Sequence, residues 1–169
     1  MPGWPLIAAG AVAATGATVF ALGRCLPLEH RVRRSLELRR PPEAVWDVLT
    51  DIERFPHWRP GVTRVERLPD EAGRLCWREY GRHGDAAYEL VDATPPLRLV
   101  TAIADPRLPF GGTWTYELTP WPGGCTLTVV ERGEIRSPLY RFVSRYLTGH
   151  AATLERHLAA LAAQLGGRA

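Results

Sequence analysis

The residues best suited to bind a small molecule are aromatic side chains on segments with strand character. In the segment TWTYEL, polar and apolar residues alternate, so Trp114 and Tyr116 lie on one face of a regular strand. Trp77 and Tyr88 fall on other strand-like segments, and Tyr146 falls on an apolar helical stripe. Large aromatic side chains usually pack in a core. They also line cavities for apolar ligands, where phenol oxygens orient the ligand, and the pattern leaves both roles open.

Two polar residues are candidates for a proton donor or acceptor. Leu127, Val129 and Glu131 share one face of a strand, so an inward apolar pair carries Glu131 inward near the strand end. His150 lies one helical turn beyond Tyr146. A desolvated carboxylate would have a raised pKa or an arginine partner. Equally, Glu131 fits a charge at the rim of a sheet, and His150 fits a surface histidine.

Sequence signatures of common catalytic and metal sites are absent. The chain has no P-loop, no G-x-S-x-G turn, no G-x-G-x-x-G, and neither C-x-x-C nor H-E-x-x-H. Its five histidines are scattered, and no acidic pair near His150 and His157 completes a set of metal ligands. The three cysteines are far apart and show no disulfide framework. We therefore expect neither a metal nor a cofactor.

Short strands and two helical regions would position these side chains. Seven strand-like segments are separated by turn residues: 30–40, 63–68, 75–80, 86–93, 97–104, 113–118 and 125–135. After the first strand, EAVWDVLTDIERF has apolar residues at helical spacing and ends at Phe55-Pro56. After the last, Ser137-Pro138 begins an amphipathic helix of roughly 40 Å that ends at Gly166-Gly167. This order predicts an antiparallel meander flanked by helices.

The order of elements and several segments resemble the START-like, helix-grip (SRPBCC) superfamily, in its polyketide cyclase/dehydrase and lipid-transport branch. The resemblance covers about residues 30–166. Its matching segments are PPEAVWDVLTDIERFPHWRPGV (41–62), YELVDATPPLRLV (88–100), GGTWTYELTPWPGGCTLTVVERGEI (111–135) and the terminal helix. The resemblance implies an α+β fold in which a seven-stranded antiparallel sheet wraps around a long C-terminal helix, with two short helices after strand 1. An apolar cavity would lie between the sheet and the long helix.

The resemblance also places two loops at the mouth of the cavity. One is FPHW, which ends at Trp58, and the other is DPRLPFGG at 105–112. The second is either a mobile lid or a rigid, proline-braced turn. No residue is assigned a catalytic role. The predicted ligand-binding residues are Trp58, Trp77, Tyr88, Trp114, Tyr116, Glu131, Tyr146 and His150.

The first 23 residues carry no charged side chain. As a helix, residues 4–23 would span roughly the 30 Å of a bilayer core. Because arginines follow directly, the positive-inside rule places the remainder in the cytoplasm. We expect a single-pass cell-membrane protein with an anchor at 1–23, a basic juxtamembrane linker at 24–29, a helix-grip domain at 30–166 and a tail at 167–169. The alternative is a cleaved secretory signal, although the segment lacks a basic n-region and is long for a signal.

The net charge of +3 comes from one short segment. Residues 24–40 hold six arginines and two acids, whereas residues 41–169 hold 15 arginines against 16 acids. The expected domain is therefore nearly neutral, which argues against a nucleic-acid-binding surface. The arginines beside the apolar span suit anionic lipid headgroups instead.

These features predict a membrane-tethered domain that binds a hydrophobic small molecule, such as a lipid, an isoprenoid or a polyketide-like compound. Apolar burial would supply most of the affinity, and one or two polar side chains would orient the ligand. The alternative is a polyketide cyclase, aromatase or dehydratase that uses the same cavity, with Glu131, Tyr116, Tyr146 or His150 as proton acceptor or donor. A third hypothesis is a module that binds a partner protein. We expect neither nucleic acid nor metal as a partner.

Overall fold

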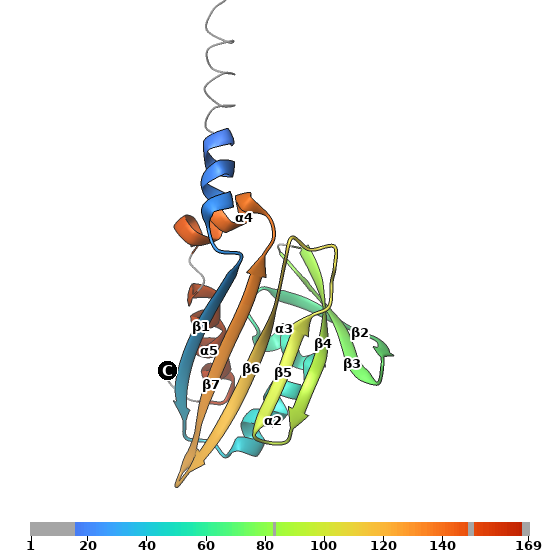
Figure 1. Ribbon diagram of the computed structural model, residues 1–169. Coiled ribbons are helices and arrows are strands. Elements are labelled where there is room, and N and C mark those ends of the chain that lie inside the picture. The colour runs from blue at the N-terminus through green and yellow to red at the C-terminus, as the bar shows by residue number, and fades with distance from the viewer. Residues whose placement is uncertain (1–15, 83, 149–150, 167–169) are drawn as a thin grey trace, which may run out of the picture.

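A computed structural model describes residues 16–82, 84–148 and 151–166 of the chain (Figure 1). Its strands form one antiparallel sheet in the order β1-β7-β6-β5-β4-β3-β2. The strands are β1 (Glu29–Leu38), β2 (Val62–Glu71), β3 (Arg74–Gly81), β4 (Gly84–Thr94), β5 (Arg98–Ile103), β6 (Phe110–Trp121) and β7 (Gly124–Ile135). The first strand pairs with the last, so β1 and β2 form the two edges. The predicted seven-stranded antiparallel sheet is confirmed.

The register of β6 and β7 decides which side chains face the helices. Trp114 lies opposite Glu131, and Tyr116 lies opposite Val129. Because side chains alternate along a strand, these four residues share one face of the sheet with Leu127. Leu127 and Val129 are fully buried, which identifies this face as the inner one.

Short helices after β1 pack on the inner face of the sheet. They are α2 (Pro42–Thr50), a 3-10 turn η1 (Ile52–Arg54) and α3 (Phe55–Trp58), as expected for two short helices after strand 1. The segment FPHW, predicted as a loop, is thus the helix α3. Proline suits the first turn of α2, because its ring fixes φ and its missing N–H would have no intrahelical acceptor. Val45 and Leu49, one turn apart, are buried and join the core.

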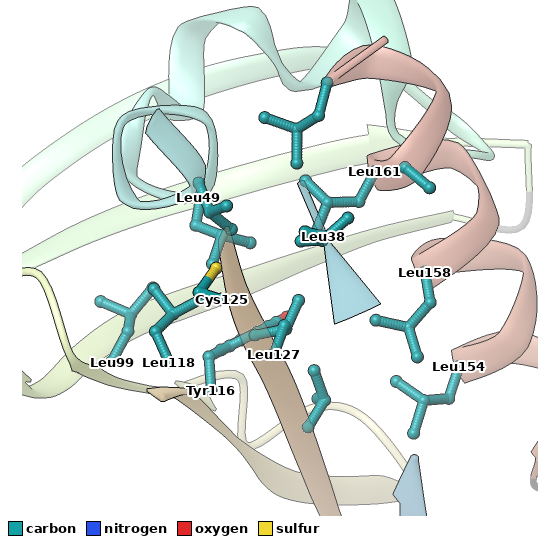
Figure 2. Packing of buried hydrophobic residues seen from close by; sticks show 14 residues of the cluster. Leu38, Leu49, Leu99, Tyr116, Leu118, Cys125, Leu127, Leu154, Leu158 and Leu161 are labelled. Atoms are coloured by element: carbon teal, nitrogen blue, oxygen red, sulfur yellow. The ribbon is translucent and has the colours of Figure 1, made fainter. Parts of the chain in front are cut away.

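The main core lies between the inner face, α2 and the C-terminal helix α5 (Ala151–Gln164). Figure 2 shows the leucines of α5 directed toward Leu38 and Leu127. A second, smaller cluster of buried residues, centred on Phe55 and Trp77, lies toward β3. Two of the three cysteines are buried and Cys25 is exposed, and all three are free thiols.

The terminal helical region is not the single α-helix that its apolar spacing predicts. It consists of α4 (Pro138–Val143), a π-helical segment η2 (Ser144–Thr148) and α5. Ser137 caps α4 as predicted, and its Oγ accepts a hydrogen bond from the Tyr140 N–H at 3.5 Å. A π-helical turn holds more residues, so a spacing of 3.6 does not keep one face across it. The prediction of one regular α-helix is therefore wrong, and α5 alone lies along the sheet (Figure 1).

The N-terminal residues that the structure describes pack against α4. Residues 4–15 of the predicted span lie outside the described residues, and residues 16–25 are helical. Among the described residues, no helix has both the length and the apolar character needed to cross a membrane. A Cβ on Gly23 would lie 2.0 Å from the carbonyl oxygen of Pro138, and Arg141 Nη1 donates to the Leu26 carbonyl at 3.0 Å. The helix at 16–25 and α4 thus meet at one end of the molecule (Figure 1).

Candidate functional site

A cavity of about 490 Å³ lies between the sheet and α5. Its walls come from β3, β4, β6, β7 and α5 and from residues 59–62 and 108–110. Its apolar and aromatic lining includes Tyr80, Tyr88, Phe110, Trp114, Tyr116, Tyr140 and Leu154. Two other hollows, of about 540 and 530 Å³, are bordered by charged surface residues such as Arg40 and Arg132. The cavity of about 490 Å³ is lined by buried polar groups, and it is therefore the candidate site.

Packed aromatic rings form one wall of the cavity. Trp77 and Tyr88, paired across β3 and β4, stack with their planes 15° apart and their centroids 5.7 Å apart. Tyr88 in turn contacts Trp114 at a centroid separation of 6.2 Å. Burial raises the pKa of Tyr88 and of Tyr116 to about 12. At neutral pH both phenols therefore stay protonated and can donate or accept a hydrogen bond.

An ion pair between the partly buried Arg59 and the buried Glu79 lines the cavity, and we call it the polar floor. Arg59 Nη1 lies 2.5 Å from Glu79 Oε1, which also accepts a hydrogen bond from Trp77 Nε1 at 3.0 Å. The guanidinium carbon lies 5.1 and 5.7 Å from the ring centroids of Phe55 and Tyr88. Burial lowers the pKa of Arg59, but Glu79 and two nearby phenols outweigh this effect, so the pKa is raised overall. The polar floor is therefore charged but electrically balanced.

His157 of α5 adds an uncharged imidazole to the cavity wall. Its ring centroid lies 5.4 Å from that of Trp58 and 6.0 Å from that of Tyr116. Burial, helped by the positive charge of Arg59, lowers the pKa of His157 to about 3. Its Nε2 is buried and has no hydrogen-bond partner among the described residues, and the same holds for Trp58 Nε1. Since buried polar atoms normally have partners, a molecule in the cavity would gain by bonding to His157.

Four of the eight predicted ligand-binding residues line the cavity: Tyr88, Trp114, Tyr116 and Glu131. The Glu131 side chain is 13% exposed, and its Oε1 lies 3.4 Å from His30 Nε2 on the adjacent strand β1. The partner of this carboxylate is thus a histidine and not an arginine, which was one of the two alternatives given by the sequence. Because Trp114 lies opposite Glu131 in the register of β6 and β7, the cavity holds this carboxylate beside an aromatic wall.

The structure places the other predicted residues elsewhere. Trp77 is 3% exposed and does not line the cavity, although its ring stacks on Tyr88. Trp58 is partly buried and packs beside His157. Tyr146 is 62% exposed, packs on Phe142 at a centroid distance of 4.9 Å and does not line the cavity. The helical side of the cavity is instead formed further along the chain, by residues of α5. His150 lies outside the described residues.

Three polar residues of the site were not predicted: Arg59, Glu79 and His157. For two of them, a periodic pattern in the sequence indicates an inward-facing position. Glu79 follows Trp77 by two positions and so shares its strand face, and His157 lies on the same helical stripe as Leu154 and Leu158. Arg59 follows α3 with an extended backbone, and no periodic pattern includes it.

The loop before β6 is braced by ion pairs. Asp105 is 5% exposed, and its carboxylate accepts from Arg107 Nη2 at 2.6 Å and from Arg78 Nη1 at 3.3 Å. The hydrogen bonds from Arg107 hold the pKa of Asp105 well below its usual range. Because β6 begins at Phe110, the connection is also shorter than the predicted 105–112. Of the two alternatives for this loop, the geometry favours the rigid turn.

The sequence also matches a known family. The model for polyketide cyclase/dehydrase and lipid transport proteins matches residues 29–166. Among the curated proteins compared with the chain, none is similar to it.

Solved structures share the fold at low sequence identity. The Zhui aromatase/cyclase from Streptomyces sp. R1128 is 14% identical, with a TM-score of 0.63 over 82% of this chain and 94% of that one. A START superfamily protein from Mycobacterium smegmatis is 16% identical, with a TM-score of 0.61 over 81% and 97% of the two chains. The di-domain ARO/CYC StfQ from the steffimycin biosynthetic pathway is 16% identical, with a TM-score of 0.64 over 80% of this chain and 50% of StfQ. This chain thus spans half the length of StfQ, and these likenesses show the fold alone.

Proposed function

The chain belongs to the polyketide cyclase/dehydrase and lipid transport family, and we propose that it is a membrane-tethered START-like domain that binds a hydrophobic small molecule. The observation that carries this proposal is the aromatic cavity. Its volume of about 490 Å³ falls within the range of about 300–1,000 Å³ that is usual for ligand sites. Burial against the aromatic wall would supply the affinity, at about 25 cal/mol per Å² of apolar surface. The polar floor would orient one end of a lipid, an isoprenoid or a polyketide-like compound.

Exposed apolar side chains support a tether at the end where the N-terminal helix meets α4. Six large apolar residues are exposed on this helix, on the segment before β1 and on α4 and η2: Phe20, Leu22, Leu28, Leu139, Tyr140 and Tyr146. Clustered exposed apolar residues are typical of surfaces that meet a membrane or a partner. The arginines within 24–40 would attract anionic headgroups, and by the positive-inside rule they favour a domain in the cytoplasm.

The position of the cavity agrees with such a tether. Tyr140 of α4 lines the cavity and lies 6.2 Å from Phe110, ring centroid to ring centroid. The cavity therefore reaches the end of the molecule that carries the exposed apolar residues. A tether there would hold the cavity close to a lipid-soluble ligand and raise its effective concentration.

The binding proposal is tested by extracting the detergent-purified full chain with organic solvent and analysing the extract by mass spectrometry. We expect a retained lipophile, and we expect Trp114→Ala to retain about tenfold less, which corresponds to about 1.4 kcal/mol of lost apolar contact. The matched control is Trp121→Ala, because Trp121 is exposed and lies outside this cavity. Equal retention by both variants, or no lipophile with the wild-type chain, would contradict the proposal.

Glu131 favours a second candidate function, a polyketide cyclase-type enzyme. His157 is a poor general base at neutral pH because its pKa is about 3. Glu131 is a carboxylate in the same cavity, and its charge acts on the phenol of Tyr116, so this pair would be the base and the proton donor. The test is formation of a cyclised product from a poly-β-ketone thioester. Glu131→Gln should slow product formation at least about a hundredfold, and turnover that survives this substitution would remove the enzymatic assignment.

A further inference from the structure

One nitrogen in the cavity wall has no hydrogen-bond partner in the described part of the chain. It is Nε2 of His157, which is buried and belongs to a ring that lines the cavity. The phenols of Tyr116 and Tyr88 line the same cavity. A ligand group beside His157 would therefore meet hydrogen-bonding atoms on α5, β6 and β4. The tautomer of His157 decides whether Nε2 donates or accepts.

The charges around this nitrogen are unfavourable for an anionic ligand. Arg59 is paired with Glu79, and Glu131 adds a second carboxylate to the inner cavity. A ligand carboxylate would therefore lie near two like charges. The other arginines that line the cavity, Arg82 and Arg156, are exposed at its rim. The inner cavity thus has no unpaired cation within the described residues with which to receive an anion.

Resting on the binding function proposed above, we propose that the cavity selects hydrophobic alcohols and phenols over carboxylates, with the ligand hydroxyl hydrogen-bonded to His157. A hydroxyl both donates and accepts, so it satisfies Nε2 in either tautomer and pairs with a tyrosine phenol as well. A carboxylate only accepts. The low pKa of His157 agrees with this selection, because the ring stays neutral and offers no charge to a carboxylate.

The selection is measured by competition between ligands with the same chain. The detergent-purified full chain is incubated with equimolar 1-dodecanol and dodecanoate at pH 7.5, repurified, and its retained ligands are quantified by gas chromatography. We expect the alcohol to exceed the carboxylate at least about tenfold, the effect of one hydrogen bond to a buried partner. His157→Phe should reduce this preference to threefold or less, and His157→Gln, which keeps a hydrogen-bonding group, should restore part of it.

The matched control is His57→Phe, because His57 is exposed on α3 and does not line the cavity. This control should retain the wild-type preference. Retention of both ligands in equal amounts, a preference for the acid, or a preference unchanged in His157→Phe would each overturn the selectivity but leave the binding function standing. Retention of neither ligand by the wild-type chain would overturn the binding function and the selectivity together. Far-UV circular dichroism confirms that each variant is folded before its ligands are counted.

Discussion

The two helices of the terminal region, α4 and α5, contain similar proportions of apolar residues but differ in how deeply these residues are buried. In α5, Leu154, Leu158 and Leu161 are buried against the sheet and α2. In α4 no residue is buried, and Leu139 is 53% exposed. The difference follows from where each helix lies, since α5 runs along the inner face and α4 lies beyond the end of β7 (Figure 1). Helical periodicity shows which residues share a face, but it does not show whether anything covers that face.

The two helices also have different roles. α5 supplies both core leucines and His157, so the same helix stabilises the fold and forms a wall of the cavity. α4 supplies one cavity residue, Tyr140, and otherwise presents apolar side chains to the surroundings near the N-terminal helix. Substitutions in α5 should therefore change the free energy of unfolding, whereas substitutions in α4 should change mainly what its surface contacts.

The largest expected effect comes from truncating a leucine in each helix. Leu161 is fully buried, so Leu161→Ala should lower the free energy of unfolding by about 3 kcal/mol through lost contact and a residual cavity. Leu139→Ala, on the exposed face of α4, should change it by less than about 0.5 kcal/mol. Urea denaturation of the full chain in detergent measures both values, from midpoints compared at a constant slope. Similar losses for the two variants would show that α4 is as well packed as α5.

Much of the fold could be predicted from the sequence, because clear turn residues bounded the strand segments and several of those segments alternated between polar and apolar residues. The pairing of β1 with β7 was not predicted, because the two strands lie at opposite ends of the domain sequence and no local pattern joins them. The division of the terminal helix was not predictable in the same way. Leu139, Val143 and Leu161 fit one helical spacing, and the π-helical segment that shifts the stripe has no signature in residue type.

The site was predictable where it depended on strand alternation. Trp114, Tyr116 and Glu131 were placed by a period of two, and the register of β6 and β7 sets them on one face. The polar floor depends instead on a contact between Arg59, which follows α3, and Glu79 of β3. Such a pair joins segments that are distant in the chain, and a single sequence does not specify their approach. Charged residues are also usually exposed, so neither Arg59 nor Glu79 was predicted to lie in the site.

We expect an intermediate effect on the free energy of unfolding from the protonation of His157 in α5. The helix α4 contains no histidine. The pKa of His157 is about 3 in the folded chain, against 6.5 when unfolded. The unfolded chain therefore binds the proton first, so stability is fully present above about pH 6.5 and is lost as the pH falls toward 3. Between pH 6.5 and 5 the loss should be about 1.5 kcal/mol. Urea denaturation at half-unit pH steps measures it.

The contribution of His157 is isolated by comparing slopes. Between pH 6.5 and 5, the free energy of unfolding of His157→Phe should fall by about 1.5 kcal/mol less than that of the wild-type chain. His57→Phe should keep the wild-type dependence on pH. Carboxylates with lowered pKa values, such as Asp105 and Asp85, lose their contribution at lower pH, since their unfolded values lie near 3.8. A slope unchanged in His157→Phe would show that the ring is accessible to protons in the folded chain.

The smallest expected effect comes from the cap of α4, and it tests whether the two helices unfold separately. Ser137→Ala removes the oxygen that accepts from the Tyr140 N–H, a bond whose length of 3.5 Å indicates a weak cap. We expect a local loss of about 0.5 kcal/mol, which should speed hydrogen exchange of α4 amides about twofold. Ser137→Asp, which retains a capping oxygen, should restore wild-type exchange. Amides of α5 should not respond, because their protection derives from the core leucines. If they accelerate together with those of α4, the whole terminal region opens as one cooperative unit, and the contrast between the helices is one of exposure and not of stability.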